Sequence, residues 1–254
     1  MLLAIDIGNT NTVVGLFDGR ILRNDFRFAS RHNRTSDEAG ILISDVIMRE
    51  GFKNADIDKA VIASVVPPLT SVYENTVRVY FKIEPLMVSH RLKLPVKIEI
   101  SQPEQVGADR IANAVAGFKK YGGPVIVVDF GTATTFDIVN ENGAYIGGII
   151  VPGPDTSMAE LAKRAARLFE VRIEPPDSVV GKSTAGALKS GLFYGTVGQV
   201  DYIIEKIIEE TGFENPSIIA TGGLAQRINE YSRFIKKVEP NLTLEGLQII
   251  SDFN

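Results

Sequence analysis

The sequence predicts an α/β fold built from two like halves with a central cleft between them. Two short apolar strands each end in an aspartate and a glycine-containing turn, at Asp6–Thr12 and at Asp129–Thr135. A hairpin dipeptide follows each aspartate 12 or 13 residues later, Asp18-Gly19 in the first half and Asn142-Gly143 in the second. Strand and helix signals then recur in the order βββαβα, which indicates an internal duplication. Because paired domains commonly bind ligands where they face each other, we expect the cleft to hold the site.

Apolar runs bounded by turn residues predict four strands in the first half. A capping box from Thr35 to Glu38 predicts the start of the first helix, because each side chain can accept a hydrogen bond from the other residue's backbone N–H. We expect this helix to bury its apolar residues, which are Ile41, Leu42, Val46 and Met48. The predicted strands are Leu2–Ile5, Thr12–Phe17, Arg20–Phe28 and Lys59–Val66, and a second helix is predicted at Thr70–Phe81.

The second half repeats these signals after Gly122-Gly123-Pro124, a sequence that interrupts regular structure. We therefore predict two domains, residues 1–118 and residues 119–254, and a helix at Ile111–Phe118 just before the boundary. The strands predicted for the second half are Pro124–Val128, Phe136–Val139, Tyr145–Val151 and Ser217–Ala220, and its helices are Thr196–Glu210 and Leu224–Phe234.

Composition restricts the chemistry that the chain can perform. The 254 residues include no cysteine and only two histidines, which excludes thiolate metal sites and cysteine nucleophiles and disfavours a histidine-rich metal site. A net charge of -4 gives no reason to expect nucleic acid or a membrane surface as a partner. The sequence has no basic leader and no apolar run near the roughly 20 residues of a membrane span. We therefore expect a cytoplasmic protein.

The two aspartate turns have the parts that a phosphate site needs. Glycine lets the backbone approach a phosphate closely, and small hydroxyl side chains and backbone N–H groups can bind its oxygens. An aspartate at the strand end can hold a cation that offsets the phosphate charge. Each turn by itself could be an ordinary hairpin, but the repeat of the whole unit favours a pair of nucleotide-phosphate loops.

The paired loops resemble those of the actin, sugar-kinase and heat-shock chaperone ATPase superfamily, which implies duplicated actin-like ATPase (ribonuclease H-like) domains. Within that superfamily, four strings in one order resemble type III pantothenate kinase over essentially the whole chain. They are Asp6–Asn11, Gly107–Arg110, Asp129–Thr135 and Gly147–Gly153. The resemblance implies an enzyme that transfers a phosphoryl group from ATP to the primary hydroxyl of pantothenate, the first step toward coenzyme A.

The resemblance also implies how the two loops divide their work. The first loop would hold the ATP triphosphate, with Asp6 also binding Mg²⁺, and Thr132 of the second loop would bind phosphate. Asp129 would hold a monovalent cation, K⁺ or NH₄⁺. The ATP-binding residues implied in this way are Asp6, Ile7, Gly8, Asn9, Thr10, Asn11, Thr12, Val13 and Thr132.

The string Gly107–Arg110 lies before a predicted helix and has two interpretations. Asp109 could cap the helix, as aspartate commonly does at a helix N-terminus. The resemblance instead implies that Asp109 is the catalytic base that accepts the hydroxyl proton, and the planar fork of Arg110 suits an anionic group. The substrate-binding residues implied are Gly107, Ala108, Asp109, Arg110, Thr184 and Ile100.

Three other features qualify this picture. Gly181–Thr184 ends like a P-loop, but Pro176 stands where that motif requires glycine, so the string is not a P-loop. The resemblance implies that Thr184 contacts substrate from the neighbouring subunit of a homodimer.

Ile100 stands where the family commonly has a tyrosine, so one contact to pantothenate is lost or supplied elsewhere. Thr221–Gly223 either lets adenosine approach the backbone or forms a plain strand–helix turn.

Two other functions remain open from the sequence. A sibling kinase acting on another small hydroxylated metabolite would carry the same phosphate loops and differ in the pocket. A non-catalytic ATP-binding regulatory protein would not need the acceptor string Gly107–Arg110, which is intact here. ATP consumption that depends on pantothenate distinguishes these alternatives.

Overall fold

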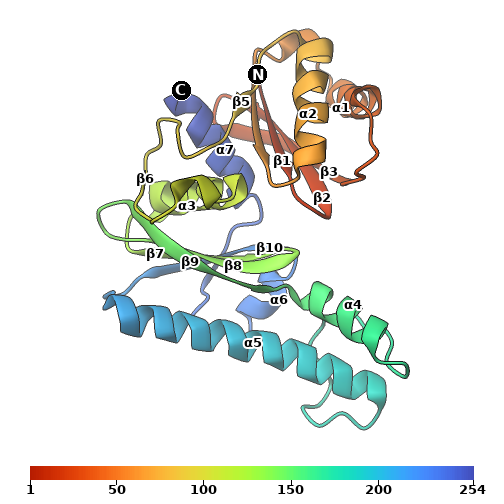
Figure 1. The fold of residues 1–254 in the computed structure, drawn as a ribbon, viewed down its shortest axis with the longest axis vertical. Helices are drawn as coiled ribbons and strands as arrows, with labels where there is room; N and C mark the ends of the chain where they lie inside the picture. The colour runs from red at the N-terminus through yellow and green to blue at the C-terminus, as the bar shows by residue number, and fades with distance from the viewer. The chain divides into compact units, whose positions relative to one another are not determined.

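The computed structural model describes residues 1–254 and divides into two compact units (Figure 1). The first unit contains Met1–Lys120 together with Asn241–Asn254, and the second contains Tyr121–Pro240. The predicted halves, 1–118 and 119–254, differ from these units mainly in the C-terminal segment, which returns to the first unit. The apolar side chains of this segment are buried in the first unit. No local signal in the sequence shows which of the two sheets a C-terminal helix will cover. The cleft expected between the halves stays a prediction.

The first unit is built on a mixed sheet with the strand order β3-β2-β1-β4-β5. The central strand β1 (Leu2–Ile7) pairs antiparallel with β2 (Asn11–Asp18) and parallel with β4 (Lys59–Ser64). At the edges lie β3 (Ile21–Ala29) and the short β5 (Leu86–Met87). All four strands predicted for this half are confirmed to within a few residues, because apolar runs flanked by turn residues are a strong local signal.

Helices cover both faces of this sheet. Side chains of α1 (Ser36–Arg49) and α2 (Pro67–Thr76) share one buried cluster with Val14 and Leu16 of β2. On the opposite face, α7 (Leu242–Phe253) contacts β1 and β4. The predicted helix at Thr70–Phe81 is confirmed, although it starts at Pro67 and ends in a π turn. The shorter pieces of this unit are Asn54–Asp56, Val77–Phe81, β6 (Lys97–Ile98) and Pro103–Gln105.

The capping box at the start of α1 is confirmed, but the predicted buried face of that helix is wrong. The Glu38 backbone N–H donates to Thr35 Oγ1, and the Thr35 N–H donates to Glu38 Oε2. Ile41 and Met48 are mostly exposed, at 62% and 60%. The residues that α1 does bury are Ala39, Gly40, Ile43 and Ile47.

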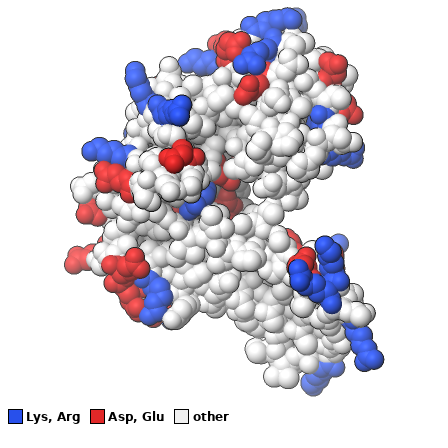
Figure 2. Space-filling model, viewed as in Figure 1, with Lys and Arg blue, Asp and Glu red and all other residues white.

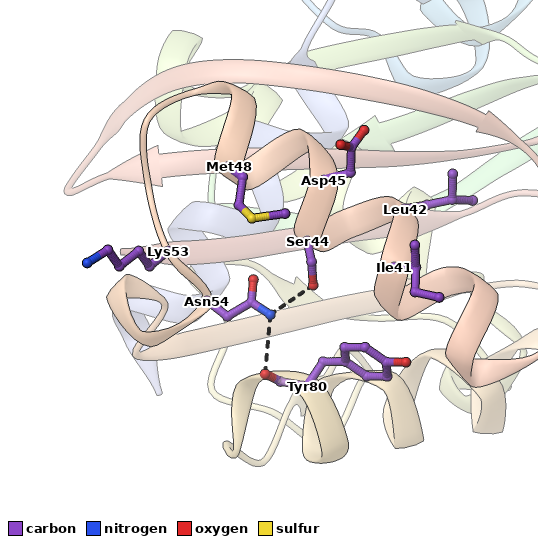
Figure 3. Close-up of a pocket in the computed structure, with 8 residues that line it drawn as sticks. All are labelled: Ile41, Leu42, Ser44, Asp45, Met48, Lys53, Asn54 and Tyr80. Atoms are coloured by element: carbon purple, nitrogen blue, oxygen red, sulfur yellow. Dashed lines mark hydrogen bonds between the residues drawn. The ribbon is translucent and has the colours of Figure 1, made fainter.

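Gly40 explains this rotation of the helix. A Cβ on Gly40 would overlap the ring of Tyr80, so the ring lies directly on the helix backbone. This close contact turns the larger apolar side chains of α1 outward. Figure 3 shows Ile41, Leu42 and Met48 lining a pocket of about 540 Å³ beside Tyr80. No predicted site residue lines this pocket. Its lining residues are Ile41, Leu42, Ser44, Asp45, Met48, Lys53, Asn54 and Tyr80.

The second unit repeats the sheet of the first. Its strands run in the order β11-β10-β7-β8-β9. The central strand β7 (Val125–Phe130) pairs antiparallel with β8 (Ala133–Val139) and parallel with β10 (Ser217–Gly222), as β1 does with β2 and β4. β9 (Ala144–Pro152) extends the hairpin and β11 (Lys237–Val238) lies beside β10. The predicted internal duplication is therefore confirmed, and the predicted strand Tyr145–Val151 is confirmed as β9, which contains most of the string Gly147–Gly153.

One long helix covers this second sheet. α5 (Thr184–Thr211) packs Phe193, Val200 and Ile204 on the sheet, together with α6 (Ala225–Asn229), and Figure 1 shows α5 running along the sheet. The remaining helix, α4 (Pro154–Arg164), follows β9. No helix in the structure has both the length and the apolar character needed to span a bilayer.

Two helix limits differ from the predictions for a local reason. α5 starts at Thr184 instead of Thr196, because the Ser183 hydroxyl caps it by accepting from the Gly186 N–H. The predicted helix Leu224–Phe234 ends at Asn229. Beyond it, Ser232 Oγ accepts from two backbone N–H groups and donates to buried Asp201, which fixes a turn in place of further helix.

Candidate active site

The hairpin between β1 and β2 presents the first predicted phosphate loop. Asp6 lies near the carboxyl end of β1, paired with Val13, and the turn closes where the Gly8 N–H donates to the Asn11 carbonyl at 3.0 Å. A Cβ on Gly8 would lie 3.1 Å from that carbonyl oxygen, so the turn fits glycine closely. Asn9 and Thr10 are exposed at its tip. The loop therefore presents a carboxylate, an amide and a hydroxyl together.

Thr12 lies behind this turn and not at its surface. Its side chain is fully buried, and its Oγ1 shares a 2.9 Å hydrogen bond with Ser30 Oγ. The Ser30 N–H donates to the Thr10 carbonyl at 2.9 Å, so the start of the β3–α1 connection braces the turn. Ile7 is also fully buried, with its backbone paired to Thr12. Ile7 and Thr12 thus fix the shape of the loop.

The second loop has the same backbone plan. Asp129 pairs with Thr135, and the Gly131 N–H donates to the Ala133 carbonyl at 3.1 Å. The exposed Thr132 is held from behind, since its carbonyl accepts from the Gly153 N–H at 3.0 Å and from Thr156 Oγ1 at 2.7 Å. In the sequence, Gly153 is only the last residue of the string Gly147–Gly153. Its lack of a side chain is what lets α4 start against Thr132.

Asp129 lies against a glycine of the neighbouring strand. Gly222 has a φ of +90°, and a Cβ on it would lie 2.7 Å from Asp129 Oδ1 and 2.5 Å from the Phe130 carbonyl oxygen. The Gly223 N–H donates to the same Phe130 carbonyl at 3.2 Å. Glycine at position 222 therefore lets the backbone of β10 lie directly against the carboxylate. Neither of the two interpretations of Thr221–Gly223 from the sequence included this contact with Asp129.

The acceptor string Gly107–Arg110 forms the first turn of α3 (Ala108–Tyr121). Asp109 lies inside that turn, where its Oδ1 accepts from the Arg110 N–H at 2.8 Å, so the capping interpretation is met in part. A Cβ on Gly107 would overlap Asp109 Oδ1, which means that the carboxylate folds back over the glycine. Burial raises the pKa of Asp109, and the Arg110 backbone and charge oppose this increase.

Val65 lies between the acceptor string and the first phosphate loop. The Cβ position of Gly107 lies 3.4 Å from Val65 Cγ1, and the Val65 N–H donates to the Ile7 carbonyl at 3.1 Å. All of these residues belong to the first unit. The structure thus brings Asp109 to the end of β1 that carries Asp6. Sequence reasoning missed Val65, because its only signal was its position directly after a strand parallel to β1.

The other predicted substrate residues lie on separate elements. Thr184 is the exposed first residue of α5, and Gly181 packs against the first turn of that helix at Ala187. Thr184 belongs to the second unit, and its contact with substrate stays a prediction. Ile100 is half-buried in the first unit, two residues after β6.

Two like hairpins on duplicated sheets, with a third carboxylate beside the first, are the arrangement expected of an ATP-using phosphotransferase of the actin-like ATPase class. Comparison with known families is more specific. A family model described as type III pantothenate kinase matches residues 2–206. The chain belongs to the type III pantothenate kinase family. A curated type III pantothenate kinase from Agathobacter rectalis is 43% identical over 250 residues, covering 98% of this chain and 96% of that protein.

Solved structures support the same fold. A Campylobacter jejuni protein assigned to the Baf family of transcriptional activators has a TM-score of 0.61 at 23% identity, covering 98% of this chain and 97% of that one. The activator of 2-hydroxyisocaproyl-CoA dehydratase from Clostridium difficile, solved with bound ADPNP, has a TM-score of 0.57 at 12% identity, covering 99% and 94%. At these identities the likeness concerns the fold alone.

Proposed function

We propose that this chain is a pantothenate kinase that transfers the terminal phosphoryl group of ATP to pantothenate, forming 4'-phosphopantothenate in the first step of coenzyme A biosynthesis. This proposal is supported by the match of the family model to residues 2–206 and by the 43% identity to a curated pantothenate kinase. The structural observation that carries it is the position of Val65, which lies close to Gly107 and donates its N–H to the Ile7 carbonyl beside Asp6. An acceptor base next to a phosphate loop is the arrangement that phosphoryl transfer requires.

Asp109 is the proposed base. It would orient the acceptor hydroxyl and take its proton as the new phosphorus–oxygen bond forms. Its raised pKa supports this role, because a more basic carboxylate has a greater tendency to hold the proton that it receives. Its hydrogen bond from the Arg110 N–H uses Oδ1, which leaves Oδ2 for the substrate hydroxyl.

Pantothenate binding is assigned to the same turn. Gly107 and Ala108 offer backbone at the start of α3, and Arg110 would pair with the carboxylate of pantothenate, for which its guanidinium has the right geometry. Thr184 is proposed to contact pantothenate from the partner subunit. Ile100 would supply an apolar contact where the family commonly has tyrosine, so we expect substrate affinity to rely more on Arg110.

The first loop is the proposed triphosphate site. Its exposed Asn9 and Thr10 and the backbone from Gly8 to Val13 would bind phosphate oxygens, with Ile7 and Thr12 as the buried frame. The half-buried carboxylate of Asp6 beside this turn fits Mg²⁺, which prefers oxygen ligands. When bound, Mg²⁺ would neutralise phosphate charge.

Asp129 is the proposed monovalent cation residue, with Thr132 binding phosphate on the second loop. Asp129 Oδ1 and the Phe130 carbonyl oxygen both lie beside Gly222, and oxygen atoms of this kind are suitable ligands for a K⁺ ion. Such an ion would offset the charge of the nucleotide. The two loops therefore share a backbone plan and phosphate binding but would hold different cations.

A homodimer is part of this proposal, and α5 offers the surface for it. From Ser190 to Val200 the helix has no charged residue, and Figure 2 shows its middle without Lys, Arg, Asp or Glu side chains. Within this stretch Tyr194 is exposed, at 36%. An uncharged exposed stripe of this kind is typical of a protein interface. We also propose a cytoplasmic location, where ATP is available.

The test is a coupled assay of ADP release by the purified protein with ATP and Mg²⁺. We expect release only when pantothenate is added, and a loss of activity when K⁺ is replaced by Na⁺. Equal release without pantothenate would favour a regulatory ATPase, and preference for another hydroxylated metabolite in a substrate panel would favour a sibling kinase. Full activity in Na⁺ would contradict only the proposed cation binding by Asp129 and not the kinase activity.

A further inference from the structure

The C-terminal helix α7 touches α3 backbone to backbone. A Cβ on Gly246 would lie 2.6 Å from the carbonyl carbon of Ala112 and 3.0 Å from its Cα, and still closer to its carbonyl oxygen. Gly246 is not among the glycines with positive φ, so its own conformation does not require glycine. Ala112 is fully buried and has no open space to move into. The neighbouring helix is therefore what requires glycine at position 246.

A hydrogen bond fixes the same crossing. Thr243 Oγ1 donates to Asn113 Oδ1 at 2.8 Å, and Asn113 is fully buried. Near the C-terminal end of α3, Lys120 forms an ion pair with Glu245 of α7. These contacts connect α3 to α7 at two places along its length.

The opposite side of α7 is attached to the sheet that carries the first phosphate loop. α7 contacts β1 and β4, and its Leu247 and Ile250 are fully buried. Leu244 packs on β2, with Cδ1 3.0 Å from the Cβ position of Gly15. The helix thus lies between the strand that ends at Asp6 and the helix that begins at Asp109.

We infer that α7 is a positioning element for the reaction, in which Gly246 and Thr243 set the place of Asp109 relative to the first phosphate loop. Ala112 follows Asp109 by about one helical turn, so a shift at the crossing moves the carboxylate directly. Val65 lies close to one end of this turn, and α7 contacts the residues that follow it. The inference rests on the proposed role of Asp109 as the base.

The principal variant is Gly246→Ala in the full-length protein. Alanine is the better helix former, so any loss comes from the clash with α3 and not from a weaker α7. A misplacement on the order of 1 Å can lower turnover by about a hundredfold. We expect kcat to fall by about that factor with KM for ATP within about twofold, because the first loop is not displaced. The acidic limb of the kcat profile should move to lower pH as the carboxylate becomes better hydrated.

Two sets of controls separate positioning from stability. Thr243→Val removes the hydroxyl and should lower kcat about tenfold, the loss expected for one hydrogen bond, while Thr243→Ser should restore wild-type kcat. Ile43→Val weakens the core on the α1 side of the sheet. It should lower the melting temperature and leave kcat unchanged when assayed well below that temperature.

The outcomes are decisive in each direction. Wild-type kcat and an unshifted pH profile in folded Gly246→Ala and Thr243→Val would overturn the inference. If Gly246→Ala does not fold, the Thr243 pair decides the matter by itself. Asp109→Asn in the same assay tests whether Asp109 is the base separately from whether α7 positions it. An active Asp109→Asn enzyme overturns the base, whereas an inactive one beside normal α7 variants overturns only the positioning role.

Discussion

Asp109 combines a buried carboxylate with a glycine that makes room for it. Its Oδ1 accepts from the Arg110 N–H, and a side chain at Gly107 would overlap that oxygen. Burial raises its pKa, which means that the folded protein holds a charge there at a cost to its stability. A carboxylate that is both desolvated and closely fitted by its surroundings is typical of a catalytic residue and not of a plain helix cap.

Replacing Asp109 by asparagine tests its chemical role. The asparagine side chain keeps the shape of the aspartate but cannot accept a proton, so Asp109→Asn should lower kcat by about 10²–10⁴-fold, the usual contribution of a general base. Nucleotide affinity, measured by calorimetry, should stay near the wild-type value. The exposed Asp177 provides the matched control, since Asp177→Asn should leave kcat unchanged. Near-normal turnover of Asp109→Asn would exclude Asp109 as the base.

The same substitution should change stability with a defined sign. Because the pKa of Asp109 is raised on folding, the native state binds more protons than the unfolded state between the unfolded and native values. The free energy of unfolding contributed by this group therefore falls as pH rises through that window. Asp109→Asn should melt at a higher temperature than wild type at pH 7, and the gain should shrink as the pH approaches about 3.9. Calorimetry from about pH 4 to about pH 8 measures it; a gain that is independent of pH would contradict this origin.

At the scale of elements, side-chain hydrogen bonds decide where helices begin and end. Thr35 starts α1, Ser183 starts α5, and Ser232 with Asp201 holds a turn after α6. Capping serine and threonine could be recognised in the sequence at α1, where the partner Glu38 is three residues away. The turn after α6 depends on Asp201, which is 31 residues from Ser232, so local reasoning extended that helix too far.

The capping box of α1 contributes a measurable amount to the free energy of unfolding. Thr35→Ala removes the acceptor for the Glu38 N–H, and a lost N-cap lowers the free energy of unfolding by about 1 kcal/mol. Thr35→Ser keeps the acceptor and should cost much less. Urea unfolding of the two variants measures the difference. Equal stability of the alanine and serine variants would show that this cap contributes nothing at the start of α1.

At the scale of the whole molecule, each unit is a sheet covered by helices, but only the first unit receives a helix from the far end of the chain. α7 buries Leu242, Leu247 and Ile250 there. The first unit therefore cannot complete its core until the second has been synthesised. The long uncharged stretch of α5 has no equivalent in the first unit, which is why we place the homodimer surface on the second.

The homodimer can be broken by one charge. Gly195 lies on the exposed face of α5 with nothing within 4 Å of an added Cβ, so Gly195→Arg fits the single chain but places a charge in the proposed interface. Light scattering after gel filtration should give twice the 27.7 kDa chain mass for wild type and the single mass for the variant. Glu210→Arg, at the charged end of the same helix, should remain dimeric. A monomeric wild-type protein would contradict the interface.

Local sequence signals were enough to predict the strands, the two aspartate turns, the duplication and the family, because each is recorded in residues that are neighbours along the chain. Packing in three dimensions settled which face of α1 is buried, where Gly222 meets Asp129, and which sheet α7 covers. These features depend on residues far apart in the sequence: Tyr80 against Gly40, Gly222 against Asp129, and Gly246 against Ala112. A glycine looks the same in the sequence wherever it lies. Only the atoms that its missing side chain would strike show whether it forms a turn, lies against a carboxylate or lets two helices touch.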